Sequence, residues 1–338
     1  MSTAANKPDT RDAERREGAP RGRSARRPGE IPKAGWRDIL QRVWTAIGKD
    51  NVSLVSAGLA MYALLAVFPS LAAAVSIYGA FASPQDVIRD MNTFAGVMPP
   101  GTWEIISKQL QEVARHAGST LTATAGIALL VSLWSGRSGM AALITATNIA
   151  YSEPEKRGFF RLILISLLFT TGSILALLLM LLLGVAVPLI VKVFGMSESA
   201  EAIVDVFRWI LLWLVAIVGL AVIYRYAPAR NRPKWRWVTW GSVVASTLWL
   251  AGSLLFAVYV RTFAAYGKTY GALGGVIALL MWFYVSSFTI VLGAEINAEM
   301  ERQTRHDTTE GHQKPMGQRG AYAADTLGPS ADEGPLGR

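Results

Sequence analysis

The sequence lacks cysteine and has only three histidines among its 338 residues: His116, His306 and His312. The lack of cysteine excludes a disulfide framework, a thiolate nucleophile and a cysteine-ligated zinc or iron–sulfur centre. Metal-dependent hydrolysis of RNA needs clustered histidine and aspartate ligands, which three dispersed histidines do not supply. We therefore expect no catalytic residues, no metal site and no cofactor, and we expect that the protein is not an enzyme.

Charged side chains are also scarce. They make up 17% of the chain, whereas hydrophobic residues make up 52% and the mean hydropathy is +0.33. The apolar residues gather into long runs that contain almost no charge. In a soluble protein, such runs would form helices that are apolar on every face. The composition therefore indicates an integral membrane protein.

Six of the apolar runs are long enough to cross a membrane, because a bilayer core of about 30 Å needs about 20 helical residues. The predicted spans are residues 52–80, 121–149, 162–191, 206–224, 237–260 and 270–296. The sequence therefore predicts an all-α polytopic membrane protein with six transmembrane helices.

The net charge of +9 is distributed unevenly. Of the 33 Lys and Arg residues, 25 lie in the segments that share a side of the membrane with the N-terminus: 1–50, 150–161, 225–236 and 297–338. The positive-inside rule therefore predicts that both termini are cytoplasmic. Basic loops at this surface attract anionic lipid. We expect membrane lipids, possibly anionic ones, as partners and no nucleic acid, and the oligomeric state stays open.

Two terminal tails, one amphipathic helix and one long loop are predicted besides the spans. Residues 1–33 are rich in Arg, Pro, Gly and Ser and are predicted to form a disordered basic tail. Residues 34–49 are predicted to form an amphipathic helix, either in the membrane interface or packed on the bundle from the cytoplasm. Residues 81–120 have amphipathic periodicity, which fits short helices on the outer face or a lid over the bundle. Residues 303–338 are predicted to be a second disordered cytoplasmic tail.

Four stretches of this chain, in this order, resemble the YihY/BrkB family of bacterial inner-membrane proteins. They are SAGLAMYALLAVFPSL, LWSGRSGMAALITATNIAY followed by EKRGF, the RYAP loop with its WRW, and YGALGGVIALLMWFYVSSFTIVLGAEINAEME. The resemblance covers about Trp36 to Arg302. It implies a six-helix protein of the bacterial inner membrane, so that the 81–120 loop would be periplasmic. Members are described as virulence factors or transporters, and some are linked to envelope lipids.

The same family was formerly labelled a ribonuclease, a reading that the scattered histidines argue against. We expect a transporter-like protein that moves an amphipathic envelope molecule, such as an anionic lipid, through a cavity between the first, second and last helices. The alternative is a structural or regulatory scaffold that binds anionic lipid through its basic loops without turnover.

Arg137 is the one ionisable residue well inside a predicted span, in LLVSLWSGRSGMAALI. A charge in this position usually faces a cavity or a partner, and the neighbouring small residues favour a break in the helix. The other interpretation is that Arg137 extends its side chain to the headgroups. The candidate substrate-binding residues are Arg137, Ser135, Ser138, Asn148, Ser56 and Tyr62.

Other residues in the spans have structural interpretations. Pro69 is expected to kink the first span, and Gly271, Gly274 and Gly275 are expected to allow close helix packing. Acidic residues are missing from the spans up to Glu295, which argues against proton or sodium coupling. We expect Glu295 and Asn297 to pair with the basic loops near Arg157 or Arg225.

Overall fold

The computed structural model describes residues 21–79, 121–181, 183, 198–262 and 272–331. These residues form helices joined by turns, and they contain no strand apart from one isolated antiparallel bridge between Pro233 and Thr309. The described part of the chain is therefore all-α, as predicted. The predicted 81–120 loop, residues 1–20 and 332–338 and Gly271 lie outside the described residues.

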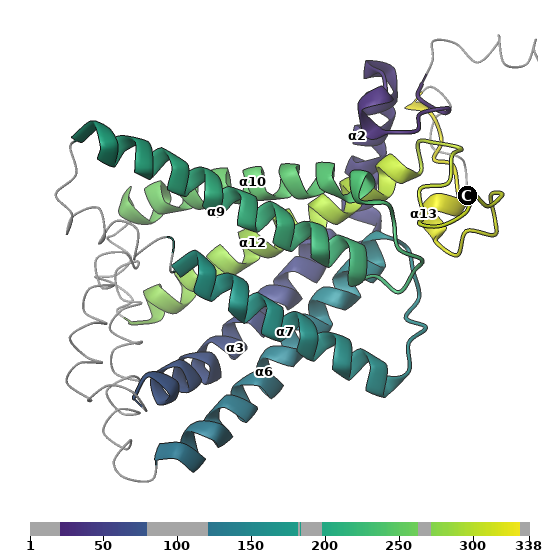
Figure 1. Ribbon diagram of the computed structural model, residues 1–338. Coiled ribbons are helices and arrows are strands. Elements are labelled where there is room, and N and C mark those ends of the chain that lie inside the picture. The colour runs from purple at the N-terminus through teal and green to yellow at the C-terminus, as the bar shows by residue number, and fades with distance from the viewer. Residues whose placement is uncertain (1–20, 80–120, 182, 184–197, 263–271, 332–338) are drawn as a thin grey trace, which may run out of the picture.

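Long helices overlap all six predicted runs (Figure 1). They are α3 (Val52–Gly79), α6 (Leu121–Ala150), α7 (Phe159–Leu181), α9 (Glu198–Tyr226), α10 (Trp235–Thr262) and α12 (Ala272–Glu301). α9 begins before the predicted span because its first turns contain Glu198, Glu201 and Asp205, which continue the helix without being apolar. Hydropathy marks the apolar part of such a helix, not its ends.

By length and composition, four helices could cross a membrane: α7, α9, α10 and α12. A fifth candidate span consists of α2 (Lys33–Lys49) together with the first part of α3, which meet at a bend of 63°. Asn51 lies at this bend with a φ of 50°. Four or five candidate spans among the described residues support a polytopic membrane protein.

α2 packs on α12 through one face. Ile39 and Val43 of α2 join Trp237, Ile296 and Met300 in a buried apolar cluster. The opposite face leaves Leu40 and Trp44 exposed. α2 is therefore amphipathic, with one face on the bundle and the other toward the surroundings.

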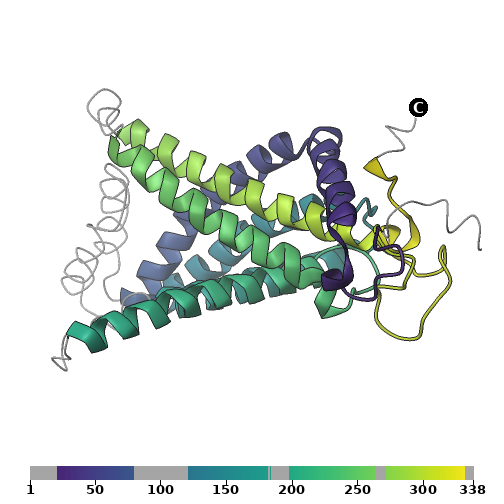
Figure 2. The same cartoon turned by 90° about the horizontal axis from the view of Figure 1, so that it is seen from above.

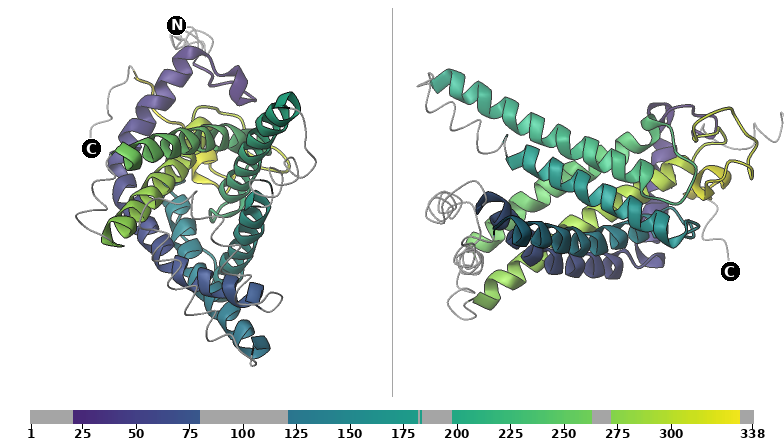
Figure 3. Two further views of the ribbon diagram at one scale, coloured as in Figure 1. Left: turned by 90° about the vertical axis from the view of Figure 1, so that its left-hand side faces the viewer. Right: turned by 60° about the horizontal axis from the view of Figure 1, so that its bottom comes forward.

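The helices come together at one end of the molecule and spread toward the other (Figure 2). α3 packs along α6 and α12, α10 packs between α9 and α12, and α7 contacts both α6 and α9. Figure 3 shows α7 and α9 along one side of the bundle, away from α3. The turn after α6, the loop between α9 and α10, and the segment after α12 all meet at the narrow end (Figure 1).

The crossing of α10 and α12 is very close. A Cβ atom on Gly241 would lie 2.3 Å from the Gly293 carbonyl oxygen, so neither position has room for a side chain. Asn297 of α12 stabilises the crossing, since its Oδ1 accepts a hydrogen bond from the Gly241 N–H of α10 at 2.9 Å. Tyr224 of α9 donates its hydroxyl to the Ile290 carbonyl at 2.7 Å. These contacts fix α9, α10 and α12 as one unit near the narrow end.

Residues 303–331 are packed against the narrow end, which differs from the predicted disordered tail. Thr304 donates its hydroxyl to the Ala25 carbonyl at 2.6 Å, so residues 21–33 are ordered with it. Arg319 is buried and donates hydrogen bonds to four backbone carbonyls, those of Arg305, His306, Lys314 and Ala324. Asp307 and Asp325 accept backbone N–H groups within the same segment. Polar side chains therefore order a segment whose composition predicted disorder.

Candidate functional site

Arg137 lies in the middle of α6, half-buried, with its guanidinium 4.6 Å from the ring centroid of Trp134. Its Nε is buried without a hydrogen-bond partner, and within the described part of the chain it has no ion pair. α6 continues through Ser135 and Ser138, so the predicted break in this helix is wrong. The cation is held by an aromatic ring on its own helix, and Ser135 and Ser138 are half-buried beside it.

The two candidate residues on α3 do not converge with Arg137 on one cavity. Ser56 is fully buried and its Oγ has no hydrogen-bond partner, whereas Tyr62 is 47% exposed. A Cβ atom added to Gly139 of α6 would lie 3.8 Å from the Tyr62 carbonyl oxygen, which is an ordinary packing distance. Neither of the two cavities described below is lined by these residues.

Asn148, the remaining candidate, lies near the C-terminal end of α6 and is buried. Its Nδ2 donates to Glu155 Oε2 at 2.9 Å, and its Oδ1 accepts the Ala229 N–H at 2.8 Å. Asn148 therefore ties the turn after α6 to the loop between α9 and α10. This places it behind the wall of a groove rather than in a central cavity.

The residues with predicted structural roles are only partly described. α3 is helical through Pro69, whose side chain lies outside the described residues. On α12, Gly275 is buried and Gly274 is half-buried. Among the described glycines, Gly241 and Gly293 also make a very close helix contact.

A groove of about 990 Å³ runs between α7 and α9 and continues into the loop after α9; we call it the basic groove. Its basic residues are Lys156, Arg157, Arg161, Arg225, Arg230 and Arg232, and no carboxylate lines it. Its apolar part is made by Leu164, Leu168 and Phe169 of α7 with Val222 and Ile223 of α9. The groove therefore joins a cationic end to an apolar channel between two candidate spans.

Four of the six cations in the basic groove already have carboxylate partners. Arg157 pairs with Glu155 at 2.6 Å, Arg230 with Glu301 at 2.7 Å and Lys156 with Glu153 at 3.3 Å, and Arg225 pairs with Glu310. Among the described residues, no ion pair involves Arg161 or Arg232. The groove therefore has two cations in excess of the acids around it.

These ion pairs also fix the protonation of the loop after α6. The hydrogen bond from the Arg157 side chain lowers the pKa of Glu155 from 4.5 to about 2. Arg230 is fully buried, and although burial lowers its pKa, the Glu301 carboxylate raises it above the ordinary value. Both shifts favour the charged forms of Glu155 and Arg230, whose ion pairs help to build the wall of the groove.

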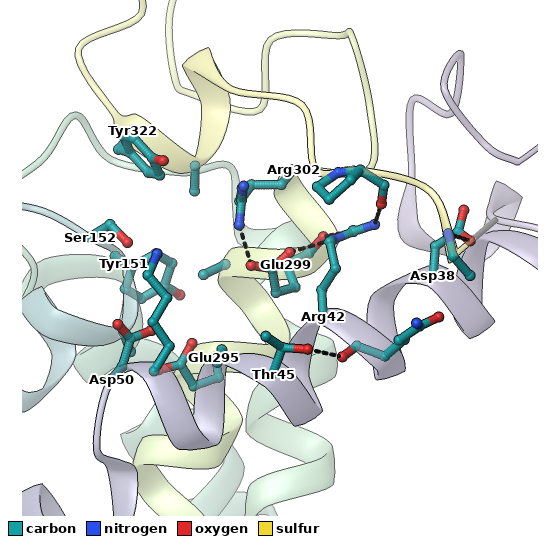
Figure 4. A pocket seen from close by; sticks show the side chains of 18 of the residues that line it. Asp38, Arg42, Thr45, Asp50, Tyr151, Ser152, Glu295, Glu299, Arg302 and Tyr322 are labelled. Carbon is teal, nitrogen blue, oxygen red and sulfur yellow. Dashed lines mark hydrogen bonds and ion pairs between the residues drawn. The ribbon is translucent and has the colours of Figure 1, made fainter. Parts of the chain in front are cut away.

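A second cavity of about 310 Å³ lies where α2 meets α3; we call it the hinge cavity. It is closed by the end of α12, by Tyr151 and Ser152 after α6, and by residues of the C-terminal segment (Figure 4). The Glu299 carboxylate of α12 accepts a hydrogen bond from Arg42 Nε at 2.6 Å and another from Arg302 Nη1 at 2.5 Å. Figure 4 shows this network, with Asp50 and Glu295 on the other side of the cavity.

The prediction that Glu295 and Asn297 pair with the basic loops is wrong. Asn297 binds the α10 backbone, at the Gly241 N–H and at the Val238 carbonyl. Glu295 lines the hinge cavity, and its Oε1 is buried without a hydrogen-bond partner. The basic loops take their partners from Glu155, Glu301 and Glu310 instead.

The sequence did contain a signal for the basic groove. The stretches EKRGFFR and RYAPARNRPKWR supply all six of its cations. Their charge predicts the topology and an attraction for anionic lipid, but it does not predict a groove. These two stretches lie together at the groove between α7 and α9 only because of the fold. Which two cations remain unpaired depends on carboxylates elsewhere in the chain.

Comparisons with known proteins give a consistent result. A family model described as Virulence factor BrkB matches residues 43–317. The ribonuclease-like protein YfkH of Bacillus subtilis is 31% identical over 74% of this chain and 90% of its own length. A UPF0761 membrane protein of Cronobacter sakazakii is 26% identical over 82% of this chain and 91% of its own length. A UPF0761 membrane protein of Vibrio cholerae is 25% identical over 77% of this chain and 86% of its own length. No solved structure gives a significant match.

Proposed function

Because the chain belongs to the Virulence factor BrkB family, we propose that it is a multi-pass protein of the bacterial inner membrane that binds anionic lipid in the basic groove and moves it between leaflets. One observation carries this proposal. Arg161 and Arg232 line a groove whose other wall is apolar, and neither has an ion pair with a described residue. A phosphate headgroup would neutralise them while acyl chains lie along Leu168 and Phe169.

The proposed topology has six spans with both termini in the cytoplasm. It is supported by the position of the segments predicted to be cytoplasmic, which meet at the narrow end of the bundle (Figure 1). The N-terminal and C-terminal segments lie there together, since the Arg305 N–H donates to the Arg23 carbonyl at 2.8 Å. The basic groove opens at this end, where the inner leaflet would supply anionic headgroups.

The absence of cysteine makes this topology directly testable. Single cysteines at Ser83 and Thr269 should react with an impermeant thiol reagent from the periplasmic side of intact cells. Cysteines at Lys156 and Gln313, both exposed at the narrow end, should react only after the membrane is opened. Labelling of the second pair in intact cells would overturn the orientation.

We further propose that the protein is not an enzyme, although one relative is named the ribonuclease-like protein YfkH. The support comes from the residue types. His306 and His312 lie 190 and 196 positions after His116, and the described residues contain no group of three His, Asp or Glu side chains arranged to hold a metal ion. Purified protein should leave transfer RNA intact in the presence of Mg²⁺, Mn²⁺ or Zn²⁺.

Binding is tested by native mass spectrometry of protein extracted gently from its own membrane. The double variant Arg161→Gln/Arg232→Gln should lose a specific anionic phospholipid that the wild type retains. The matched control is Arg27→Gln/Arg37→Gln, which removes two exposed cations outside the groove. The variant Arg137→Gln tests the site predicted on α6. Loss of lipid in Arg137→Gln alone would move the binding site to that helix.

Transport and scaffolding are distinguished by a second measurement. In liposomes with fluorescent phosphatidylglycerol in the inner leaflet, a transporter should bring the lipid within reach of an external quencher, and the double variant should not. The alternative function, a structural or regulatory scaffold, predicts specific lipid binding with no movement between leaflets. It is supported by Arg157, Arg225 and Arg230, which are fixed in ion pairs and make a rigid wall.

A further inference from the structure

The hinge cavity contains a carboxylate for which the described protein provides no partner. Glu295 is 1% exposed, and its Oε1 is buried without a hydrogen bond. A buried carboxylate without a donor or a counter-charge is strongly unfavourable. Native structures satisfy such groups, so an unsatisfied one directed into a cavity indicates a donor that binds there.

Other charged groups face Glu295 from each element around the cavity. From the end of α2 come Asp50, which acts on Glu295 as a like charge, and the exposed Lys49. From α12 come Glu299, which is occupied by Arg42, and Arg302. The carboxylates of Asp50 and Glu295 therefore form the negative side of the cavity, and both lack a hydrogen-bonding side chain among the described residues.

The opposite side of the same cavity has an unsatisfied donor. Arg302 uses Nη1 to bind Glu299, while its Nε is buried without a partner. On the α2 side, next to Asp50, Lys49 adds a cation that has no ion pair among the described residues. One cavity therefore has an unused acceptor in Glu295 and an unused donor in Arg302.

We propose that the hinge cavity binds a small zwitterion that has a primary ammonium group and a phosphate group, such as phosphoethanolamine, either free or as a lipid headgroup. The ammonium group is bound by Glu295 and Asp50, and the phosphate by Arg302 and Lys49. The volume of about 310 Å³ exceeds the size of a bare metal ion and fits a small organic group.

This site is separate from the basic groove, with which it shares no lining residue. The two also select different ligands. The groove has cations in excess and suits an anion, whereas the hinge cavity has one buried carboxylate without a hydrogen bond, Glu295, with Asp50 beside it, and suits an ammonium group. Either proposal can therefore fail without the other.

The test is calorimetric titration of the full-length protein in phosphatidylcholine nanodiscs with two soluble probes. Glycerophosphoethanolamine has both groups, and glycerophosphoglycerol lacks the ammonium group. The wild type should bind the first probe at least about tenfold more tightly than the second, because a hydrogen bond to a charged group contributes at least this much. Binding of neither probe, or equal binding of both, would overturn the proposal.

Glu295→Gln keeps the size of the side chain and removes its charge. It should lower the affinity for glycerophosphoethanolamine by about tenfold or more, and it should not lower the melting temperature, because Glu295 has no partner to lose. The matched control Glu30→Gln removes an exposed carboxylate outside the cavity and should bind as the wild type does. Equal affinities for Glu295→Gln, Glu30→Gln and the wild type would exclude Glu295 as the ligand.

A further titration shows whether the zwitterion is a lipid headgroup or a soluble compound. In nanodiscs that contain phosphatidylethanolamine, the apparent affinity for the soluble probe should fall if the lipid headgroup reaches the cavity. An unchanged affinity would identify a soluble compound as the ligand. Both results keep the proposed chemistry, and neither depends on the groove variants Arg161→Gln and Arg232→Gln.

Discussion

Arg42 and Glu299 join α2 to α12 through a hydrogen bond of 2.6 Å between residues 257 positions apart in the chain. Both side chains are buried, and Arg42 also donates to Gln303 Oε1 at 2.8 Å and to the Pro329 carbonyl at 3.0 Å. One guanidinium group thus connects the helix before the hinge, the last long helix and the C-terminal segment. Arg42 and Glu299 both line the hinge cavity, so this contact forms part of its wall.

Replacing Arg42 by methionine should destabilise the protein by about 3–5 kcal/mol, because the Glu299 carboxylate would remain buried with only Arg302 as its partner. The measurement is thermal unfolding in detergent, followed by tryptophan fluorescence. Arg37→Met is the matched control, since Arg37 is exposed on the same helix and should change the stability by less than about 0.5 kcal/mol. Equal melting temperatures for the two variants would show that the ion pair does not stabilise the fold.

The crossing of α10 and α12 gives a steric prediction. A Cβ atom on Gly293 would lie 2.4 Å from the Tyr224 hydroxyl and 2.6 Å from the Ala245 Cβ. Gly293→Ala should therefore cost about 1–3 kcal/mol through overpacking. Gly58 of α3 has no atom within 4 Å of an added Cβ, so Gly58→Ala should raise stability by up to about 1 kcal/mol. Thermal unfolding of the two variants should give shifts of opposite sign.

The ion pair of Glu155 gives a prediction about pH. Its pKa is lowered from 4.5 to about 2 by Arg157, so folding favours the ionised form. The resulting stabilisation is fully present above about pH 4.5 and is lost as the pH falls toward 2. We expect the melting temperature of the wild type to fall more steeply below about pH 5 than that of Glu155→Gln. Glu30→Gln, which removes an exposed carboxylate elsewhere, should follow the wild type. Parallel pH profiles for Glu155→Gln and the wild type would contradict the prediction.

The helices of this protein could be predicted from the sequence because each follows from a one-dimensional run of apolar residues. α3 begins at Val52, the first residue of the predicted span 52–80. The basic groove could not be predicted in the same way. Arg137 stood out in the sequence as a charge within a predicted span, whereas Arg161 was one of several loop cations. Only the fold shows that Arg161 and Arg232 line one groove and that Arg137 stacks on Trp134.

The C-terminal segment shows a second limit of the sequence. Low hydrophobicity usually predicts disorder because there is too little apolar surface to bury. Here the order comes from side chains that bind backbone groups, which composition does not reveal. Glu153 accepts the Tyr322 N–H at 2.6 Å, and Asp38 accepts the Ala331 N–H at 2.9 Å. Both acceptors lie far from their partners in the sequence, so no local pattern identifies them.

Arg319 provides the most direct test of this order. It is buried and donates hydrogen bonds to four carbonyl oxygens within its own segment. Arg319→Met keeps most of the apolar stem and leaves these carbonyls without a donor, at a cost of about 1–3 kcal/mol for each one that stays buried. Because the segment contributes little apolar burial, we expect it to detach locally while the helices stay folded. Amide hydrogen exchange should then accelerate across residues 303–331 and stay unchanged in α10 and α12.

The matched control for that experiment is His312→Ala, which alters an exposed side chain in the same segment and should leave its exchange rates unchanged. The variant also connects the tail to the hinge cavity, since Tyr322 and Pro329 form part of the cavity wall. Detachment of the segment should therefore weaken the binding of glycerophosphoethanolamine in Arg319→Met and leave anionic lipid in the basic groove largely retained. If exchange accelerates in α12 as well, the segment is an integral part of the helical bundle, because the two then unfold together.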